Sequence, residues 1–197
     1  MKNYPDYRKA TNAAYQLLAK RQSLSLTTNV FSIGEDLVEN CVLITYGQAC
    51  FLYGYTLQLL FRVSEFGFSI IKGNKRIIFY NEAAPMGSIL FTIAHEIGHA
   101  VLSHTDEHDA ASEKEANCFA RNLLCPIPVV CGLGLKAADD YVSVFSITGS
   151  MAAVAFDKRD VDRYYIKDEL FQVVSDMLDA YMMEFDDVDE YYRYFAS

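Results

Sequence analysis

The sequence predicts an α+β domain in which a small sheet packs on a central helix and further helices lie at both ends. Two apolar strands joined by a turn lead into an amphipathic helix, and segments with apolar residues at helical spacing flank this unit. The chain has 197 residues, of which 52% are hydrophobic and 22% charged. This length and composition are those of a globular protein that can bury a core.

The clearest strand signal is a hairpin. Gly67–Ile71 and Lys75–Asn81 are rich in β-branched and aromatic residues, and a turn at 72–74 joins them. Pro85 follows, and apolar residues then recur at every third or fourth position to about Ser103. The sequence therefore predicts a small antiparallel or mixed sheet that packs on this helix.

The flanking elements follow from the same periodicities. Helices are expected from Pro5 to about Arg21, within Val30–Val38, at Ala111–Leu124 and Ser146–Phe156, and around Leu170–Tyr181, with a strand at Cys41–Tyr46. The segment Phe51–Phe66 is apolar almost throughout, so its periodicity does not separate helix from strand, and a strand or mixed structure is favoured. Pro126 and Pro128 predict a looser region up to about Tyr141.

The predicted organisation is one domain over residues 1–165, which includes the N-terminal helices, with residues 166–197 as a C-terminal helical extension packed on it. The last residues, from Asp186 to Phe195, mix acidic and aromatic side chains. A helix docked on the domain is favoured for them, and a partner or dimer surface is the alternative. The oligomeric state does not follow from the sequence.

Charge and cysteine content narrow the possible settings. The formal net charge of −9 disfavours direct binding of nucleic acid, and a basic protein partner fits it better. The five cysteines are an odd number and the N-terminal residues lack the apolar core of a signal peptide, so a reducing, cytoplasmic location is expected. Because apolar runs fall short of the roughly 18–20 residues of a membrane helix, membrane insertion is not expected.

The predicted chemistry rests on the motif His95-Glu96-Ile97-Gly98-His99. Residues four apart share a helix face, so His95 and His99 can present two imidazoles to one tetrahedral Zn²⁺ ion. Glu96 faces the same cavity without being in line to ligate, and can take a proton from a water that attacks a carbonyl. An accidental motif is the alternative, but an amphipathic helix directly after an apolar strand is the setting that zinc peptidases require.

A third protein ligand is needed, because two imidazoles and a water leave the tetrahedron incomplete. The metzincin pattern is excluded, since it requires glycine and histidine where this chain has Leu102 and Thr105. The remaining candidates are His104, His108, Glu113 and Glu115.

Glu113 is favoured among these candidates, because it shares a face of the next helix with Asn117, which could orient a ligand. Glu115 is expected to face solvent and is the second choice. His104 would ligate only if the helix ended before it, and His104 and His108 are more typical of solvated loop histidines.

Two stretches resemble the ImmA/IrrE metallopeptidase family. They are Phe91–Leu102, with the sequence FTIAHEIGHAVL, and Glu113–Pro126, with the sequence EKEANCFARNLLCP. The resemblance extends to Ile77–Asn81 and, more loosely, to Val144–Thr148. Family members often have methionine where this chain has Cys125, a departure that leaves the motif residues unchanged.

The resemblance implies a gluzincin-like zinc endopeptidase. The family pattern Glu-x-x-Ala-Asn/Asp-x-Phe-Ala places a ligand glutamate on Glu113, which adds to His95 and His99 as zinc ligands. Glu96 is then the catalytic residue. The resemblance also implies that the strand Lys75–Asn81 runs along the cleft and could pair with an extended substrate through its outer edge.

Similar family members cleave helix-turn-helix repressors of mobile elements or stress regulons, so a DNA-binding repressor is the implied substrate. The chain has no persuasive helix-turn-helix segment of its own, and the repressor would be a separate polypeptide. The alternative from a different class is a zinc-bearing binding protein that sequesters a regulator without cleaving it. A deformylase-like amidase is disfavoured, because the glycine and cysteine signatures expected before its motif are absent.

Overall fold

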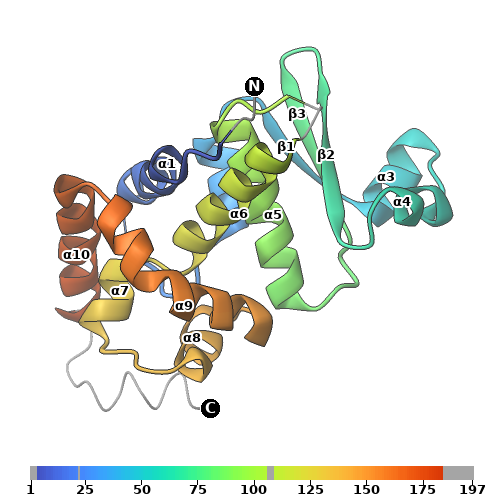
Figure 1. Ribbon diagram of the computed structural model, residues 1–197. Helices are drawn as coiled ribbons and strands as arrows, with labels where there is room; N and C mark the ends of the chain where they lie inside the picture. Colours follow the sequence, from blue (N-terminus) through green and yellow to red (C-terminus); the bar gives the residue numbers. More distant parts are fainter. Residues whose placement is uncertain (1–3, 22, 106–108, 184–197) are drawn as a thin grey trace.

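The computed structural model of the chain describes residues 4–21, 23–105 and 109–183. Its strands form a three-stranded sheet, and the remaining elements of these residues are helices. Figure 1 shows the sheet between α5 on one side and α3 and α4 on the other, with the remaining long helices gathered on the α5 side. The predicted mixed α+β class is therefore confirmed.

The elements have the following bounds. The strands are β1 (Cys41–Thr45), β2 (Gly67–Lys72) and β3 (Lys75–Tyr80). The helices are α1 (Tyr7–Ala19), α2 (Val30–Ser32), the π-helical turn η1 (Ile33–Leu37), α3 (Tyr46–Tyr53), α4 (Leu57–Val63), α5 (Met86–Val101), α6 (Ala110–Leu124), α7 (Ile127–Gly132), α8 (Ala138–Phe145), α9 (Gly149–Tyr165) and α10 (Asp168–Met183). No described helix is both long enough and apolar enough to cross a membrane.

The sheet has the order β1-β3-β2. The predicted hairpin is confirmed, because β2 and β3 pair antiparallel with Ser69 opposite Ile78. On its other side β3 pairs parallel with β1, where Leu43 lies opposite Ile78. The expectation that the strand Lys75–Asn81 offers a free outer edge is therefore wrong. Alternation along one strand predicts its two faces but not which distant strand occupies each edge, and here the edge strand of the hairpin is β2.

The two faces of the sheet belong to separate apolar clusters. Successive side chains of a strand point to opposite faces, and along β3 Ile78 joins the main core while Ile77 and Phe79 join a smaller cluster. The main core also contains the inward side of α5, for example Ile93. The smaller cluster is completed by buried side chains of β1, α3 and α4, such as Leu60. The face toward α5 is the one that supports the motif residues.

Within Phe51–Phe66 lie the end of α3 and all of α4 and no strand, so the preference for a strand or mixed structure there was wrong. Thr45 and Thr56 cap α3 and α4, and Gly54 ends α3 in the left-handed conformation with φ of 68°. Of the residues in the two helices, only Tyr46, Ala49 and Leu60 are buried. Apolar side chains therefore surround both helices, and no one-sided stripe marks them in the sequence.

The C-terminal half contains more helix than expected. α7 and α8 occupy much of the stretch from 126 to 141 that was expected to be loose, and α9 runs nine residues beyond the predicted Phe156, to Tyr165. Pro128 lies in the first turn of α7, where proline is tolerated. Asp140 accepts backbone hydrogen bonds from Lys136 and Ala137 at the start of α8, and these bonds lower the pKa of its carboxyl group.

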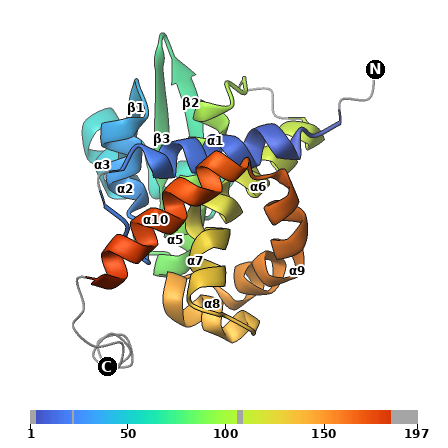
Figure 2. The same cartoon turned by 90° about the vertical axis from the view of Figure 1, so that its left-hand side faces the viewer.

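α10 lies across the outside of the helical layer, in contact with α1 and α7, as Figure 2 shows. The predicted extension began at residue 166, two residues before α10. The acidic and aromatic stretch Asp186–Phe195 lies outside the described residues, so the structure does not bear on its predicted docking.

Close packing of α5 against α6 brings the predicted ligands together. A Cβ atom on Gly98 would lie 3.0 Å from Cδ1 of Phe119 and 3.3 Å from the Cα atom of Ala116. Both neighbours belong to α6 and are fully buried. The glycine of the motif therefore lets α6 approach α5 closely enough for a carboxylate on its first turn to reach the motif histidines.

Candidate metal centre

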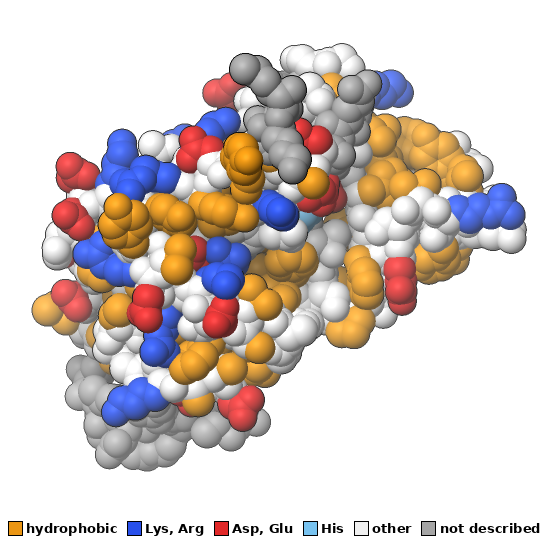
Figure 3. Space-filling view, in the orientation of Figure 1, with side chains coloured by type: hydrophobic (Ala, Val, Ile, Leu, Met, Phe, Trp, Pro, Cys, Tyr) orange, Lys and Arg blue, Asp and Glu red, His pale blue; other side chains and the backbone are white. Residues whose placement is uncertain are grey.

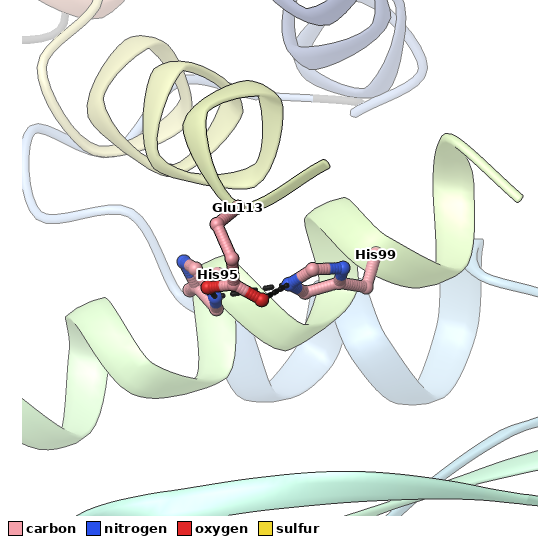
Figure 4. A group of neighbouring side chains, drawn as sticks. All are labelled: His95, His99 and Glu113. Carbon is pink, nitrogen blue, oxygen red and sulfur yellow. Dashed lines mark hydrogen bonds and ion pairs between the residues drawn. The ribbon is translucent and has the colours of Figure 1, made fainter. Parts of the chain in front are cut away.

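Three of the predicted site residues converge at the crossing of α5 and α6. The Nε2 atoms of His95 and His99 are 3.0 Å apart, and each lies 3.4 Å from a carboxylate oxygen of Glu113. Figure 4 shows the Glu113 side chain reaching from α6 to the two rings on α5. These three residues also form a group whose potential ligand atoms all lie within 4.8 Å of one another.

The separations fit a tetrahedral zinc site. Zinc bonds of about 2.0–2.1 Å at tetrahedral angles place two ligand atoms about 3.3–3.4 Å apart. The two contacts of Glu113 have this length, and the separation of the histidine nitrogens is only slightly shorter. Three protein ligands are the number that a catalytic zinc site has, with water or substrate as the fourth ligand.

The hydrogen bond of His95 leaves its Nε2 atom available for a metal. Its Nδ1 atom lies 3.1 Å from Oδ1 of Asn117, a residue one helical turn beyond Glu113 on α6. An amide oxygen only accepts hydrogen bonds, so Nδ1 carries the proton and Nε2 presents a lone pair. The structure therefore places Asn117 where the sequence suggested that it could orient a ligand.

His99 is held by a chain of two further side chains. Its Nδ1 atom lies 3.0 Å from Nδ1 of His104, whose Nε2 atom lies 3.0 Å from a carboxylate oxygen of Glu115. If the Glu115 carboxylate accepts the Nε2 proton of neutral His104, then Nδ1 of His104 accepts the Nδ1 proton of His99. In this arrangement His99 also presents the lone pair of Nε2. Metal-binding histidines commonly donate their other ring N–H to a supporting group, and here that group is His104, which Glu115 holds in turn.

The donor set therefore suits a cation. In this tautomeric arrangement two nitrogen lone pairs and one carboxylate point at the same small volume. Imidazole and carboxylate are ligands that zinc accepts, so these three groups fit a divalent ion.

The expected positions of His104 and Glu115 need correction. Both were expected in solvent, but their side chains are only 11% and 13% exposed. Ser103 adopts a left-handed conformation with φ of 60°, and the backbone N–H of His104 donates to the carbonyl of His99 at 2.9 Å. This turn at the end of α5 folds His104 back against His99. Neither residue belongs to the three-residue ligand group, and His108 lies outside the described residues.

Glu96 is buried and held by the sheet. Its side chain accepts a hydrogen bond from the hydroxyl of Ser69 at 2.6 Å, and the hydroxyl oxygen of Ser69 accepts one from Arg76 at 2.9 Å. Glu96 and Arg76 are 6% and 7% exposed. Arg76 also donates to the backbone carbonyl of His104, so the same guanidinium contacts the support of both Glu96 and His99.

Sequence reasoning did not identify Ser69 or Arg76. Their signal was present in the hairpin, because alternation along β3 puts Arg76 on the same face as Ile78, and the antiparallel register puts Ser69 opposite Ile78. Two polar residues on the core face of an otherwise apolar hairpin indicate a polar partner across the interface. Here that partner is Glu96.

Two ring nitrogens from one helix, a carboxylate from the next helix and an adjacent buried glutamate form, in an α+β domain, the arrangement expected of an HExxH-type metallopeptidase. Comparison with known families agrees with this class. Residues 59–128 match the family model of the IrrE N-terminal-like domain, a peptidase family. The matched range contains β2, β3, α5 and α6, and with them every predicted site residue. The resemblance to the ImmA/IrrE family is therefore confirmed, whereas a search of curated proteins finds no match.

The chain from Glu115 to His99 gives a testable prediction about metal affinity. His104→Phe preserves an aromatic ring but removes the acceptor for Nδ1 of His99, and it is expected to weaken zinc binding by about 10- to 100-fold. Competition with a chromophoric chelator measures the affinity. Lys114→Ala, an exposed change on α6, serves as the control and should have no effect. Zinc affinity of the His104→Phe protein within twofold of the original would contradict the supporting role.

Proposed function

We propose that the chain is a gluzincin-like zinc endopeptidase that acts on a protein substrate. The observation that supports it most directly is the convergence of His95, His99 and Glu113 at separations of 3.0 and 3.4 Å. The match of residues 59–128 to a peptidase family supports the same conclusion independently of these distances. A cytoplasmic setting is part of the proposal and is supported by the odd number of cysteines, five.

The roles of the protein groups follow from their contacts. A zinc ion held by the three ligands supplies Lewis-acid activation of water and of a peptide carbonyl. Oε2 of Glu96 accepts the hydroxyl of Ser69, while Oε1 has no hydrogen bond to the described residues. In the proposed mechanism Oε1 takes a proton from the attacking water and passes it to the leaving amine. Ser69 and Arg76 keep the carboxylate in place for both transfers.

The substrate backbone is proposed to lie along β2. β2 is an edge strand of the sheet, and its residue Ser69 contacts the catalytic Glu96. An extended peptide that pairs with the stretch from Gly67 to Ile70 would therefore pass directly beside the metal centre. β3 is not open to such pairing, because it has a neighbouring strand on both sides.

The proposed substrate is a helix-turn-helix repressor of a mobile element or stress regulon, encoded as a separate polypeptide. This part of the proposal rests on the family resemblance. The net charge of −9 supports a protein substrate with basic surfaces, a property common to DNA-binding proteins, over direct contact with nucleic acid.

Metal analysis combined with digestion of the repressor encoded beside the gene tests the proposal. The purified protein is expected to bind about one zinc ion per chain and to cut the repressor at a defined bond. A chelator should stop the cleavage, and added zinc should restore it. Full zinc occupancy without cleavage of this repressor, or of synthetic peptide libraries, would refute the peptidase assignment.

A further inference from the structure

A cavity of about 580 Å³ opens beside the metal centre. Residues of α5, α6 and the start of α9 line it, together with Phe66 just before β2. Two of its lining residues also contact a predicted zinc ligand. Asn117 is hydrogen bonded to His95, and the ring of Phe91 has its centroid 5.9 Å from that of His95. The cavity is therefore adjacent to the metal centre on the side of His95.

The lining of the cavity is mainly apolar. Phe91, Met151 and Ala155 contribute to it, and Phe66 and Val154 lie at its accessible parts with exposures of 42% and 50%. In Figure 3 hydrophobic side chains lie directly beside the small area of histidine surface visible on this face. Such a lining favours an apolar occupant, because binding it removes apolar surface of both the cavity and the occupant from water.

One charged residue, Arg121, lines the cavity, but its charge is already matched. Its Nε and Nη2 atoms donate to the two carboxylate oxygens of Asp162 at 2.6 and 2.7 Å. Asp162 lies on α9 and is 2% exposed, so the pair is internal and bidentate. The cavity therefore does not favour an acidic substrate group. To bind such a group, Arg121 would have to leave Asp162, and the Asp162 carboxylate would then be buried without a partner.

We propose that this cavity binds a large apolar side chain, such as leucine, methionine or phenylalanine, on a substrate residue next to the scissile bond. The inference rests on the proposed peptidase function and adds a substrate class to it. The volume falls within the range of about 300–1,000 Å³ that is usual for binding pockets. A peptide extended along β2 points alternate side chains toward α5, and Phe66, which immediately precedes β2, places the cavity at the start of that path.

Val154 is the position that tests the cavity with least risk to the fold, because it is half exposed and lies on the lining. Val154→Asp introduces a charge there. Val161→Asp is a matched control, since Val161 lies on the same helix, is 47% exposed and does not line the cavity. Thermal unfolding of both variants verifies that they fold alike.

The first measurement uses a library of octapeptides with the zinc-loaded protein. Cleavage sites should have a large apolar residue at one fixed position next to the cut bond, and replacement of leucine by alanine there should reduce kcat/KM by about 10- to 200-fold. Val154→Asp should reduce kcat/KM for the leucine peptide by at least tenfold and leave the alanine peptide almost unchanged. Val161→Asp should behave like the unaltered protein. Efficient cleavage without any apolar preference, or equal effects of the two variants, would overturn the cavity assignment.

The second measurement separates this inference from the peptidase proposal. Fluorescein-labelled leucine and alanine peptides are titrated with the Glu96→Gln protein, and binding is followed by anisotropy without cleavage. Preference for the leucine peptide that Val154→Asp abolishes would support the cavity even if the active protein cut no peptide. Equal binding of both peptides would reject the cavity, whether or not the protein is a peptidase.

Discussion

Glu96→Gln is expected to reduce cleavage by about 100- to 10,000-fold, which is the usual contribution of a general base. The amide has the size of the carboxylate, and its oxygen can still accept the hydroxyl of Ser69, which donates to Glu96 at 2.6 Å. It cannot take up a proton from water. Zinc content and the melting temperature should therefore remain near those of the unaltered protein while kcat/KM falls.

Glu65→Gln is a suitable control for this substitution. Glu65 is an exposed glutamate within the matched range 59–128 and is not one of the predicted site residues. Cleavage by this variant should be unchanged. If Glu96→Gln abolished cleavage in vitro but left any cellular effect on the proposed repressor intact, the alternative of a zinc-bearing protein that sequesters its partner would be favoured.

Glu113→Ala is expected to weaken zinc binding by more than about 100-fold, since the loss of an outer-shell partner alone reduces metal affinity by 10- to 100-fold. The carboxylate supplies contacts of 3.4 Å to both histidine nitrogens and is the acidic member of the ligand group. Its side chain is 42% exposed, so the fold should persist. Chelator competition measures the affinity, and circular dichroism measures the retained helix content.

Glu115→Ala distinguishes the two acidic candidates on α6. Glu115 contacts His104 and accepts the backbone N–H of Asp6, so its removal should have an effect of the smaller, outer-shell size. A Glu113→Ala protein with undiminished zinc affinity, alongside a Glu115→Ala protein without zinc, would reverse the assignment of the third ligand.

Local periodicity predicted the elements that are built from local contacts. The hairpin was recognised because β-branched and aromatic residues flank a turn at 72–74, and α5 because apolar residues recur at helical spacing from Ile89 to Ile97. The position of β3 in the middle of the sheet was not recognised, because it depends on β1, whose sequence lies more than 30 residues earlier. α3 and α4 were missed for a different reason, since exposed apolar residues on all sides hide the helical period.

The candidate site also contains residues that the sequence pattern predicts and residues that only the tertiary structure brings together. The spacing of His95, Glu96 and His99 within one helix made them predictable, and the next helix offered few alternatives to Glu113. The supporting groups depend on tertiary placement. His104 reaches His99 only because Ser103, a residue other than glycine, takes a left-handed conformation, which sequence patterns do not indicate.

The composition of the cavity wall bears on how the peptide selectivity of related proteins can diverge. The groups proposed to hold the ion and move the proton lie within residues 59–128, and so do the parts of the wall that belong to α5 and α6. The part of the wall from Thr148 to Ala155 belongs instead to α9 and the residue that caps it. Under the proposed function, substitutions on that stretch of α9 would alter which peptides are accepted without changing any residue assigned to the reaction. One part of target choice is thus encoded apart from bond cleavage and is free to change independently.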